Sequence, residues 1–205
     1  MHLTRLTLDP RSALARRDLA DPYDMHRTLT RAFVSGADDS PARFLWRLEA
    51  GSNAWATPQL LVQSAMAGNW EVLQALPGYL QCAAECRAMD QTAMLQPDRR
   101  FRFRLLANPT VTRERKRYGL VDESAQLDWL ARQGERHGFA VLGALVTASE
   151  RLNCQRKHSL GIVLQRVCFE GHLQVRDCDA LAGALLGGIG PAKAFGCGLL
   201  SLGSA

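Results

Sequence analysis

The chain has 205 residues, of which 47% are hydrophobic and 22% charged. These proportions exclude an intrinsically disordered chain and leave room for one ordinary domain or two small ones. The formal net charge of +5 favours a polyanionic partner. Because no run of about eighteen apolar residues occurs and no apolar signal segment opens the chain, we expect a soluble, cytoplasmic protein without a membrane-spanning helix.

Six cysteines are spread along the chain without a C-x-x-C pair. Without a secretory signal, buried free thiols are the usual state of such residues. A zinc site could be assembled from Cys82, Cys86, Cys154 and His158, but the loop that normally presents such ligands is missing. We therefore expect no metal site and no cofactor.

The first half of the chain alternates between strand and helix patterns. Residues 3–8 alternate apolar and polar side chains, with a slip at Arg5, as a half-buried strand does. Asp21 and Pro22 are suited to cap and begin a helix, and an apolar stripe follows them. Further strands are predicted at 44–48 and 59–63, a partly helical segment at 69–88, and a fourth strand between 79 and 96.

The second half repeats this order after a boundary at Pro97 and Asp98. In residues 100–105 arginines alternate strictly with apolar residues, which predicts a strand with a row of arginines on one face. The remaining predicted elements are a helix at 122–136, strands at 139–146 and 160–169 around a polar loop at 149–158, a helix at 177–186, and a strand at 199–202.

Each half therefore has the order strand, helix, strand, strand, helix, strand. This is the split β-α-β, or ferredoxin-like, pattern. We predict an α+β protein with two tandem ferredoxin-like (RRM-like, βαββαβ) domains, at residues 1–96 and 97–205. This fold often carries RNA, although a fold alone does not establish a function.

Basic residues are concentrated in residues 99–117. This stretch holds eight basic residues and one acidic residue, so its net charge is +7. Because almost no carboxylate neutralises this charge, a phosphate backbone would be a suitable partner. A solvated polar face is the alternative. Arg151, Arg156 and Lys157 form a second basic group in the polar loop, which could either enter a nucleic-acid groove or remain solvated.

A glycine-rich segment occupies residues 187–198. Its glycines, which allow backbone N–H groups to approach a phosphate closely, are Gly187, Gly188, Gly190, Gly196 and Gly198. Lys193 adds a point charge. The segment follows a helix and precedes a strand, so it is not a Rossmann fingerprint, and it lacks the Gly-Lys-Ser/Thr of a P-loop. A tight structural turn is the alternative.

Tyr23 and His26 lie three residues apart on the first predicted helix and therefore on the same side of it. His26 falls at the edge of the apolar stripe. Its imidazole titrates near neutral pH, which makes it a candidate catalytic acid or base. The alternative is a structural histidine beside the core.

Taken together, these features resemble the CasE family, the CRISPR-RNA-processing endoribonucleases of type I-E Cascade complexes. The most specific stretches are LDPRS at 8–12, RRDLADPYDMHRTL at 16–29 and GIGPAKAFGCGLLSL at 188–202. The stretches at 44–49, 101–109 and 116–117 also resemble the family and occur in the order expected for it. The resemblance runs from end to end and is poorest at 82–96.

The resemblance implies two ferredoxin-like domains that bind RNA across them and cut it at the base of a CRISPR repeat hairpin without a metal. The family's active-site tyrosine and histidine fall on Tyr23 and His26, and its glycine-rich loop falls on 187–198. Metal-independent cleavage by the ribose 2′-OH would leave a 2′,3′-cyclic phosphate and a 5′-OH. Whether His26 is the acid or the base, and whether Tyr23 transfers a proton, stays open at this point.

The implied partners are the CRISPR repeat hairpin, the mature guide RNA that the protein would keep, and the other Cascade subunits. The expected RNA ligands are basic side chains: Arg102, Arg104, Arg113, Arg115, Lys116, Arg117, Arg156, Lys157 and Lys193. Because the major groove of A-form RNA is deep and narrow, specificity should come from hairpin shape and the bases near its foot. The alternative is a non-catalytic subunit that binds the same hairpin and does not use His26.

Overall fold

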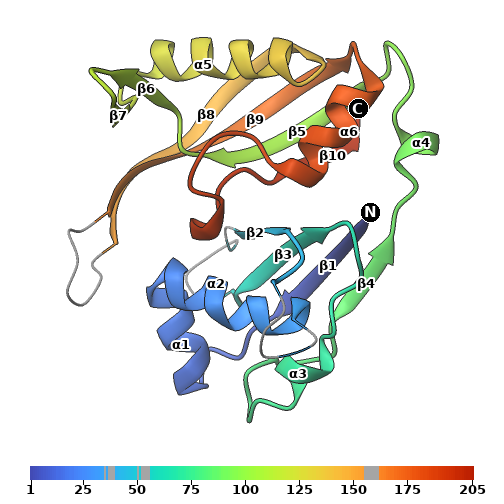
Figure 1. Cartoon of the computed structure of the whole chain (residues 1–205), viewed down its shortest axis with the longest axis vertical. Helices are drawn as coiled ribbons and strands as arrows, with labels where there is room; N and C mark the ends of the chain where they lie inside the picture. Colours follow the sequence, from blue (N-terminus) through green and yellow to red (C-terminus); the bar gives the residue numbers. More distant parts are fainter. Residues whose placement is uncertain (35, 37–39, 50, 52–55, 155–161) are drawn as a thin grey trace. The chain divides into compact units, whose positions relative to one another are not determined.

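The computed structural model describes residues 1–34, 36, 40–49, 51, 56–154 and 162–205. The chain forms two units (Figure 1): the first is Met1–Met89 with Ala194–Gly196, and the second is Asp90–Lys193 with Cys197–Ala205. The division falls a few residues before the predicted boundary at 96/97. It also assigns three residues of the glycine-rich segment to the first unit. Within the described ranges, no helix is long and apolar enough to cross a membrane.

The first unit contains β1 (His2–Thr7), α1 (Ala13–Ala20), α2 (Pro22–Thr30), η1 (Arg31–Phe33), β2 (Phe44–Leu48), β3 (Gln59–Ser64), α3 (Glu71–Gln74) and β4 (Glu85–Ala88). Its sheet has the strand order β2-β3-β1-β4, and its paired strands are antiparallel. The strands predicted at 3–8, 44–48 and 59–63 are confirmed. The fourth strand is the short β4.

Helix α1 was not predicted from the sequence. Ser12 caps it by accepting a hydrogen bond from the backbone N–H of Ala15, and its buried residues are Ala15 and Asp18. A helix whose buried face contains an aspartate lacks the apolar stripe by which an amphipathic helix is recognised. The partly helical segment expected at 69–88 is reduced to the single turn of α3.

The core of the first unit lies between its sheet and helices α1 and α2 (Figure 1). Leu6 from β1, Leu60 from β3 and Phe44 from β2 meet Met25 and Leu29 from α2 in one buried cluster. Burying each such side chain contributes about 1.5–3 kcal/mol. This packing holds α2 in place along the sheet.

The second unit contains α4 (Gln91–Met94), β5 (Arg100–Ala107), β6 (Thr110–Arg113), β7 (Lys116–Gly119), α5 (Glu123–Arg136), β8 (Phe139–Cys154), β9 (Ile162–Val175), α6 (Cys178–Gly187) and β10 (Leu200–Ser204); η2 (Lys193–Phe195) begins in it. The larger sheet has the order β10-β5-β9-β8, again with antiparallel pairs. Helix α5 packs on it through Trp129, whose ring lies 6.1 Å from that of Phe169 on β9.

The strict alternation predicted for β5 is confirmed. Phe101, Phe103 and Leu105 are buried, whereas Arg100 and Arg102 are exposed. One other expectation is wrong and one element was not foreseen. The polar loop expected at 149–158 is a strand over residues 149–154, because β8 continues to Cys154 and pairs with β9 along its polar half, and the rest of the expected loop lies outside the described residues. The hairpin β6–β7 was not predicted, because its turn at Glu114 and Arg115 contains none of the glycine or asparagine that usually marks such turns.

Candidate active site

Helix α2 carries the two candidate catalytic residues. It begins as the sequence indicates: the side chain of Asp21 accepts a hydrogen bond of 2.9 Å from the backbone N–H of Tyr23, and Pro22 occupies the first helical position. Met25 and Leu29 are buried, and Tyr23 and His26 are half-buried beside them. The helix thus presents both candidates at the border between core and surface.

The imidazole of His26 lies on an aromatic row. Its ring is stacked on that of Phe44, with centroids 4.9 Å apart and planes 24° from parallel. Phe44 is stacked in turn on Phe33 at 4.5 Å, and Phe33 meets the ring of Trp70 edge-on at 5.5 Å. Because Phe44, Phe33 and Trp70 are buried and His26 is only half-buried, His26 is the most exposed member of this row.

The two nitrogens of this imidazole have different surroundings. Nδ1 is buried and has no hydrogen-bond partner among the described residues. An imidazolium carries N–H groups on both nitrogens, so protonation would bury a charged donor without an acceptor, which is costly. Burial accordingly lowers the pKa of His26 below its ordinary value of 6.5. The neutral imidazole is therefore favoured over the imidazolium, and the tautomer with its hydrogen on Nδ1 leaves the lone pair of Nε2 to accept a proton.

A buried polar network joins α1 and α2 near this site. The carboxylate of Asp18, fully buried, accepts a hydrogen bond of 2.8 Å from the Tyr79 hydroxyl and one of 2.7 Å from Nη2 of Arg17. Burial and the adjacent Asp18 raise the pKa of Tyr79, so its hydroxyl remains a donor. Arg17 also reaches Asp24 on α2, at 3.5 Å. The network therefore fixes the first turn of α2, in which Tyr23 lies.

Part of the glycine-rich segment packs on the strand that carries Phe44. Gly196 has a φ of +78°, and a Cβ at this position would lie 3.0 Å from the ring of Trp46. Trp46 and Phe44 lie two residues apart on β2, hence on the same face of the strand, and belong to the same buried cluster. Strand β2 therefore supports both His26 and the glycine at 196.

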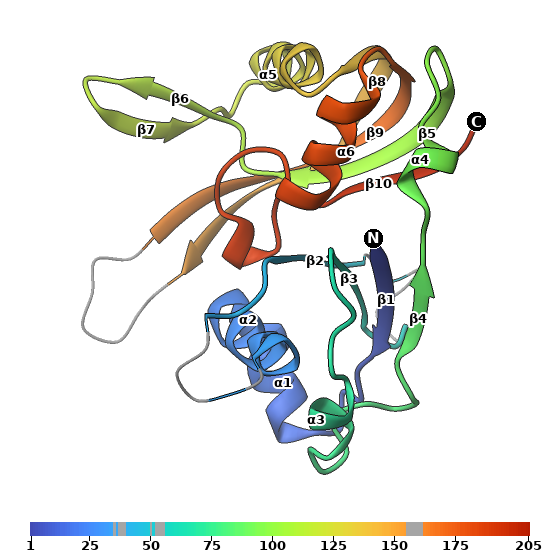
Figure 2. The ribbon, with the colours of Figure 1, turned by 45° about the vertical axis from the view of Figure 1, so that its right-hand side comes forward.

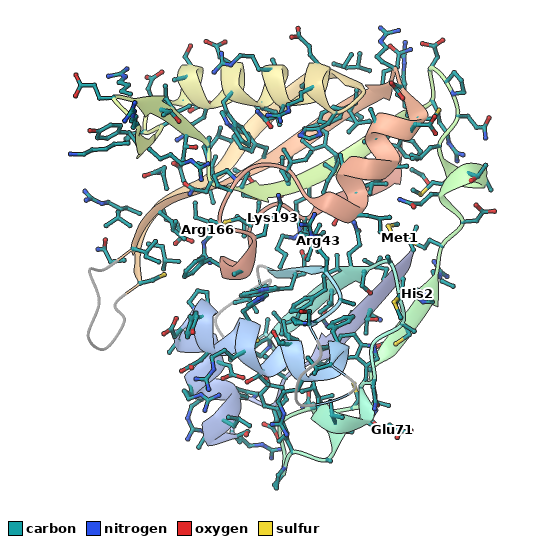
Figure 3. All side chains as sticks on the ribbon, in the orientation of Figure 1. Met1, His2, Arg43, Glu71, Arg166 and Lys193 are labelled. Carbon is teal, nitrogen blue, oxygen red and sulfur yellow. The ribbon has the colours of Figure 1, made fainter. Side chains whose placement is uncertain are left out.

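The parts of this segment on either side of Ala194–Gly196 belong to the second unit. Gly190 and Gly198 also have positive φ values, +80° and +95°, which favour glycine over residues with a Cβ. Figure 3 shows Lys193 at the start of η2 and Arg166 on β9. Lys193 is half-buried, and its side chain approaches the position that a Cβ on Gly198 would take, at 3.3 Å.

Besides Lys193 on η2, the predicted basic ligands that the structure describes lie in two places. Arg113, Arg115, Lys116 and Arg117 are brought together on the β6–β7 hairpin, where all are exposed. Arg102 and Arg104 lie on β5, where Arg104 forms an ion pair of 2.9 Å with Glu170 and Arg102 donates to the backbone oxygen of Ser204. Arg156 and Lys157 lie outside the described residues. All the described ones are in the second unit, whereas Tyr23 and His26 are in the first.

No group of three or more His, Cys, Asp or Glu side chains is placed to hold a metal ion in the part of the chain that the structure describes. Asp21 acts as a helix cap, Asp18 belongs to the buried network, and Asp24 pairs with Arg17 and Arg27. These contacts give each of the three aspartates near the candidate site a structural role.

Sequence reasoning found Tyr23 and His26 but missed three residues that shape their surroundings. Phe44 was recognised only as part of an apolar strand, because its stacking on His26 depends on a contact between separate elements. Asp18 and Tyr79 were missed because a buried aspartate has no periodic signal. The stretch RRDLADPYD around Asp18 carries a hint, since Arg17 and Asp18 pair directly.

Comparisons with known proteins show what the whole chain is similar to. The family model described as CRISPR associated protein matches residues 1–203. The CRISPR-associated endoribonuclease Cse3 of Thermus thermophilus is 38% identical over 98% of this chain and 99% of its own length. The CRISPR system Cascade subunit CasE of Escherichia coli is 31% identical over 92% of this chain and 95% of its own length.

A solved structure shows the same likeness in three dimensions. Thermus thermophilus Cse3, bound to an RNA representing a pre-cleavage complex, superimposes with a TM-score of 0.85, at 34% identity and 98% coverage of both chains. The resemblance to the CasE family that the sequence indicates is therefore confirmed. The chain belongs to the family of CRISPR-associated proteins that includes these relatives.

Proposed function

We propose that this chain is a metal-independent endoribonuclease that cleaves CRISPR precursor RNA at the base of the repeat hairpin. The observation that carries the proposal is the imidazole of His26, half-exposed on α2 with Nδ1 buried, in a chain whose Thermus thermophilus relative is named an endoribonuclease. The chain would keep its product, the mature guide RNA, and act with the other Cascade subunits, as the name of the Escherichia coli relative suggests.

The reaction we propose is an internal transfer of the phosphate. The ribose 2′-oxygen attacks the adjacent phosphorus, its proton goes to a base, and the bond to the 5′-oxygen of the next nucleotide breaks as that oxygen takes a proton. The products are a 2′,3′-cyclic phosphate and a 5′-OH. Because burial favours the neutral imidazole, we assign His26 as the general base that takes the 2′-OH proton. Tyr23, on the same side of α2, would orient the phosphate or supply the proton to the leaving oxygen.

The charge that builds up on the phosphate needs donors. We propose that Lys193 and the backbone N–H groups of the glycine-rich segment stabilise the scissile phosphate or its neighbour. The exposed cations of β6–β7, together with Arg102, Arg156 and Lys157, would hold the hairpin backbone. Arg104 would contribute less, because Glu170 already neutralises part of its charge.

We further infer that each unit has a ferredoxin-like fold. In both sheets the first and third strands in chain order occupy the centre. The second strand lies at one edge, beside the third, and the fourth strand lies at the other edge, beside the first. This order, with antiparallel pairs throughout, is the one that a split β-α-β pattern produces. The functional assignment of the two domains, with Tyr23 and His26 in the first and the basic hairpin and most of the glycine-rich segment in the second, is part of the proposal.

The test uses a labelled repeat RNA, incubated in EDTA with the wild-type chain and with the His26→Ala variant. We expect cleavage by the wild type and at least a hundredfold slower cleavage by the variant, with RNA binding retained. Replacing the 2′-OH at the cleaved nucleotide by hydrogen should stop cleavage entirely. Equal cleavage by both proteins would remove His26 from the mechanism. Binding without cleavage by the wild type would favour the non-catalytic hairpin-binding subunit instead.

A further inference from the structure

Helices α1 and α2 are joined through a single residue, Asp21, which ends the first helix and caps the second. Its backbone is extended, with φ −132° and ψ 111°. Figure 2 shows the two helices as neighbours in the first unit. Because each residue has two soft backbone dihedral angles, the direction in which Tyr23 and His26 face depends on the contacts that cross this elbow.

The side chain of Arg17, in the last turn of α1, makes such contacts. Its Nη2 donates a hydrogen bond of 2.7 Å to the buried carboxylate of Asp18, which holds the guanidinium in place. The same guanidinium reaches α2 at two points: Nε lies 3.5 Å from Oδ2 of Asp24, and Nη2 donates to Oγ1 of Thr28 at 3.4 Å. Asp24 and Thr28 are four residues apart and are therefore neighbours on one side of the helix.

The contacts of α2 divide its circumference into three sides. At about 100° per residue, Met25 and Leu29 face the core, the two α2 partners of Arg17 lie on one flank, and Tyr23 and His26 lie on the other. Burial of apolar side chains is not directional, so packing on the core still allows the helix to roll about its axis. The ion pair and hydrogen bond from Arg17 are directional, and they restrict this roll.

We propose that Arg17 is a positioning residue for the cleavage reaction. It fixes the roll of α2, and with it the direction in which the imidazole of His26 meets the RNA. This inference rests on the proposed function, because it takes His26 as the catalytic base. Misplacing a catalytic group by about 1 Å can slow a reaction about a hundredfold, so a small roll of the helix is enough to reduce the rate.

Phosphate binding is the competing role for this arginine, whose side chain is 51% exposed. The guanidinium is already paired with two carboxylates, however, those of Asp18 and Asp24, and Asp18 is fully buried. Drawing Arg17 towards a phosphate would leave the buried carboxylate without its counter-charge, which is costly. The geometry therefore favours a role within the protein over contact with the RNA.

The variant Arg17→Lys separates positioning from stability. Its single ammonium can keep the ion pair with Asp18, but it cannot also contact α2 at two points, as the planar fork of arginine does. We expect a melting temperature close to that of the wild type. With the protein in saturating excess over the repeat RNA, we expect a cleavage rate at least about tenfold lower. The Kd for an RNA made uncleavable by a 2′-deoxy nucleotide should be unchanged.

Arg16→Lys is the matched control. Arg16 is the preceding residue on α1, is exposed, and donates to the backbone oxygens of Pro10 and Arg11. This variant should keep the wild-type rate and melting temperature. Arg17→Gln, which removes the cation beside Asp18, should lose both stability and rate. If Arg17 only stabilised the fold, the lysine variant would regain both together.

Two further readouts separate orientation from charge. In the pH profile of cleavage, Arg17→Lys should lower the plateau without moving the acidic limb, because lysine keeps the positive charge. In NMR spectra, the His26 ring C–H signals report its stacking on Phe44, since the two rings lie 4.9 Å apart. These signals should move in Arg17→Lys and stay in place in Arg16→Lys.

The inference is overturned if Arg17→Lys cleaves at the wild-type rate, or if its His26 signals coincide with those of the wild type. A raised Kd with an unchanged saturating rate would also overturn it, because Arg17 would then be an RNA ligand. In either case, cleavage in EDTA that depends on His26 leaves the endoribonuclease proposal standing. If the wild type does not cleave the repeat RNA, that proposal fails, and the His26 signals still decide whether Arg17 orients the imidazole.

Discussion

At the scale of single residues, the environment of His26 determines which protonation state the chain favours. The ring stacked on it, Phe44, excludes water from one side, and Nδ1 has no acceptor among the described residues. Burial is the cause of the lowered pKa, and this distinguishes His26 from a histidine held charged by a carboxylate. A neutral imidazole at physiological pH can accept the proton of the 2′-OH.

Replacing Phe44 by leucine tests this dependence. The Phe44→Leu variant keeps an apolar side chain but removes the stacked ring, so water should reach the imidazole and the pKa of His26 should rise towards 6.5. NMR titration of the imidazole C–H signals measures this directly. For a general base, the rate falls as the pH drops through the pKa of His26. The acidic limb of the cleavage profile should therefore move to higher pH by the same amount.

The control for this variant is Phe33→Leu. It removes a ring from the same aromatic row but leaves Phe44 against His26, so the pKa should change less. An unchanged His26 pKa in Phe44→Leu would show that the stacked ring does not set it. A cleavage rate that rises as the pH falls would instead assign His26 as the general acid.

At the scale of elements, helix α1 is joined to the segment that holds Tyr79 by the contacts of a single carboxylate. Asp18 accepts hydrogen bonds from Tyr79 and from Arg17, and its side chain is closed off from water. In the Tyr79→Phe variant one carboxylate oxygen loses its donor while the packing volume is almost kept. Leaving a buried acceptor unsatisfied costs about 1–3 kcal/mol, more for a charged one.

We therefore expect Tyr79→Phe to lower the free energy of unfolding by about 1–3 kcal/mol, measured by urea denaturation. Tyr118→Phe removes the same hydroxyl from an exposed tyrosine and should change stability by less than about 0.5 kcal/mol. Equal stabilities of the two variants would mean that the Tyr79 hydroxyl does not support Asp18.

The elements also show what periodicity can and cannot predict. Strand β5 was predicted because its apolar and arginine side chains alternate without a break. The outer half of β8 has polar residues on both faces, so the alternation that predicts a strand is lost where both faces meet water. The spacing of Tyr23 and His26 placed them on one side of a helix. Stacking on Phe44 could not be predicted, since it arises from the packing of α2 on β2.

The glycine at 196 gives a prediction for the glycine-rich segment. Gly196→Ala introduces a Cβ at a φ of +78° and 3.0 Å from the Trp46 ring, and both effects disfavour the native conformation. We expect a loss of about 1–3 kcal/mol in unfolding free energy. Gly187→Ala is the matched control, because nothing lies within 4 Å of the added Cβ and the residue ends helix α6, where alanine is tolerated. If both variants lose equal stability, the contact with Trp46 is not the reason for glycine at 196.

At the scale of the whole molecule, the chain does not simply divide into two sequential halves. Ala194–Gly196 belong to the first unit, whereas the residues on either side of them belong to the second. The first unit therefore needs a segment from near the end of the chain to cover Trp46. A fragment ending at Met89 would lack this cover, so the behaviour of the first unit is best measured in the full chain.

The full chain should lose stability when the pH falls below about 6.5. In the folded state burial lowers the pKa of His26, and burial together with the positive charges of Arg136 and Lys193 lowers that of His137. Between pH 6.5 and the folded-state values, the unfolded chain takes up protons that the folded chain does not, so the unfolding free energy decreases as the pH decreases. Above pH 6.5 both states are neutral at these residues, and the contribution is flat.

Urea denaturation at pH 7.5 and at pH 5.5 measures this effect, in a window above the range in which ordinary carboxylates titrate. The double variant His26→Gln and His137→Gln, which has no imidazole at either position, should show a clearly smaller decrease between the two pH values than the wild type. Since the two histidines belong to different units, each single variant should remove part of the decrease. A wild-type chain that becomes more stable at pH 5.5 would contradict the assignment, because it would require folded-state pKa values above 6.5.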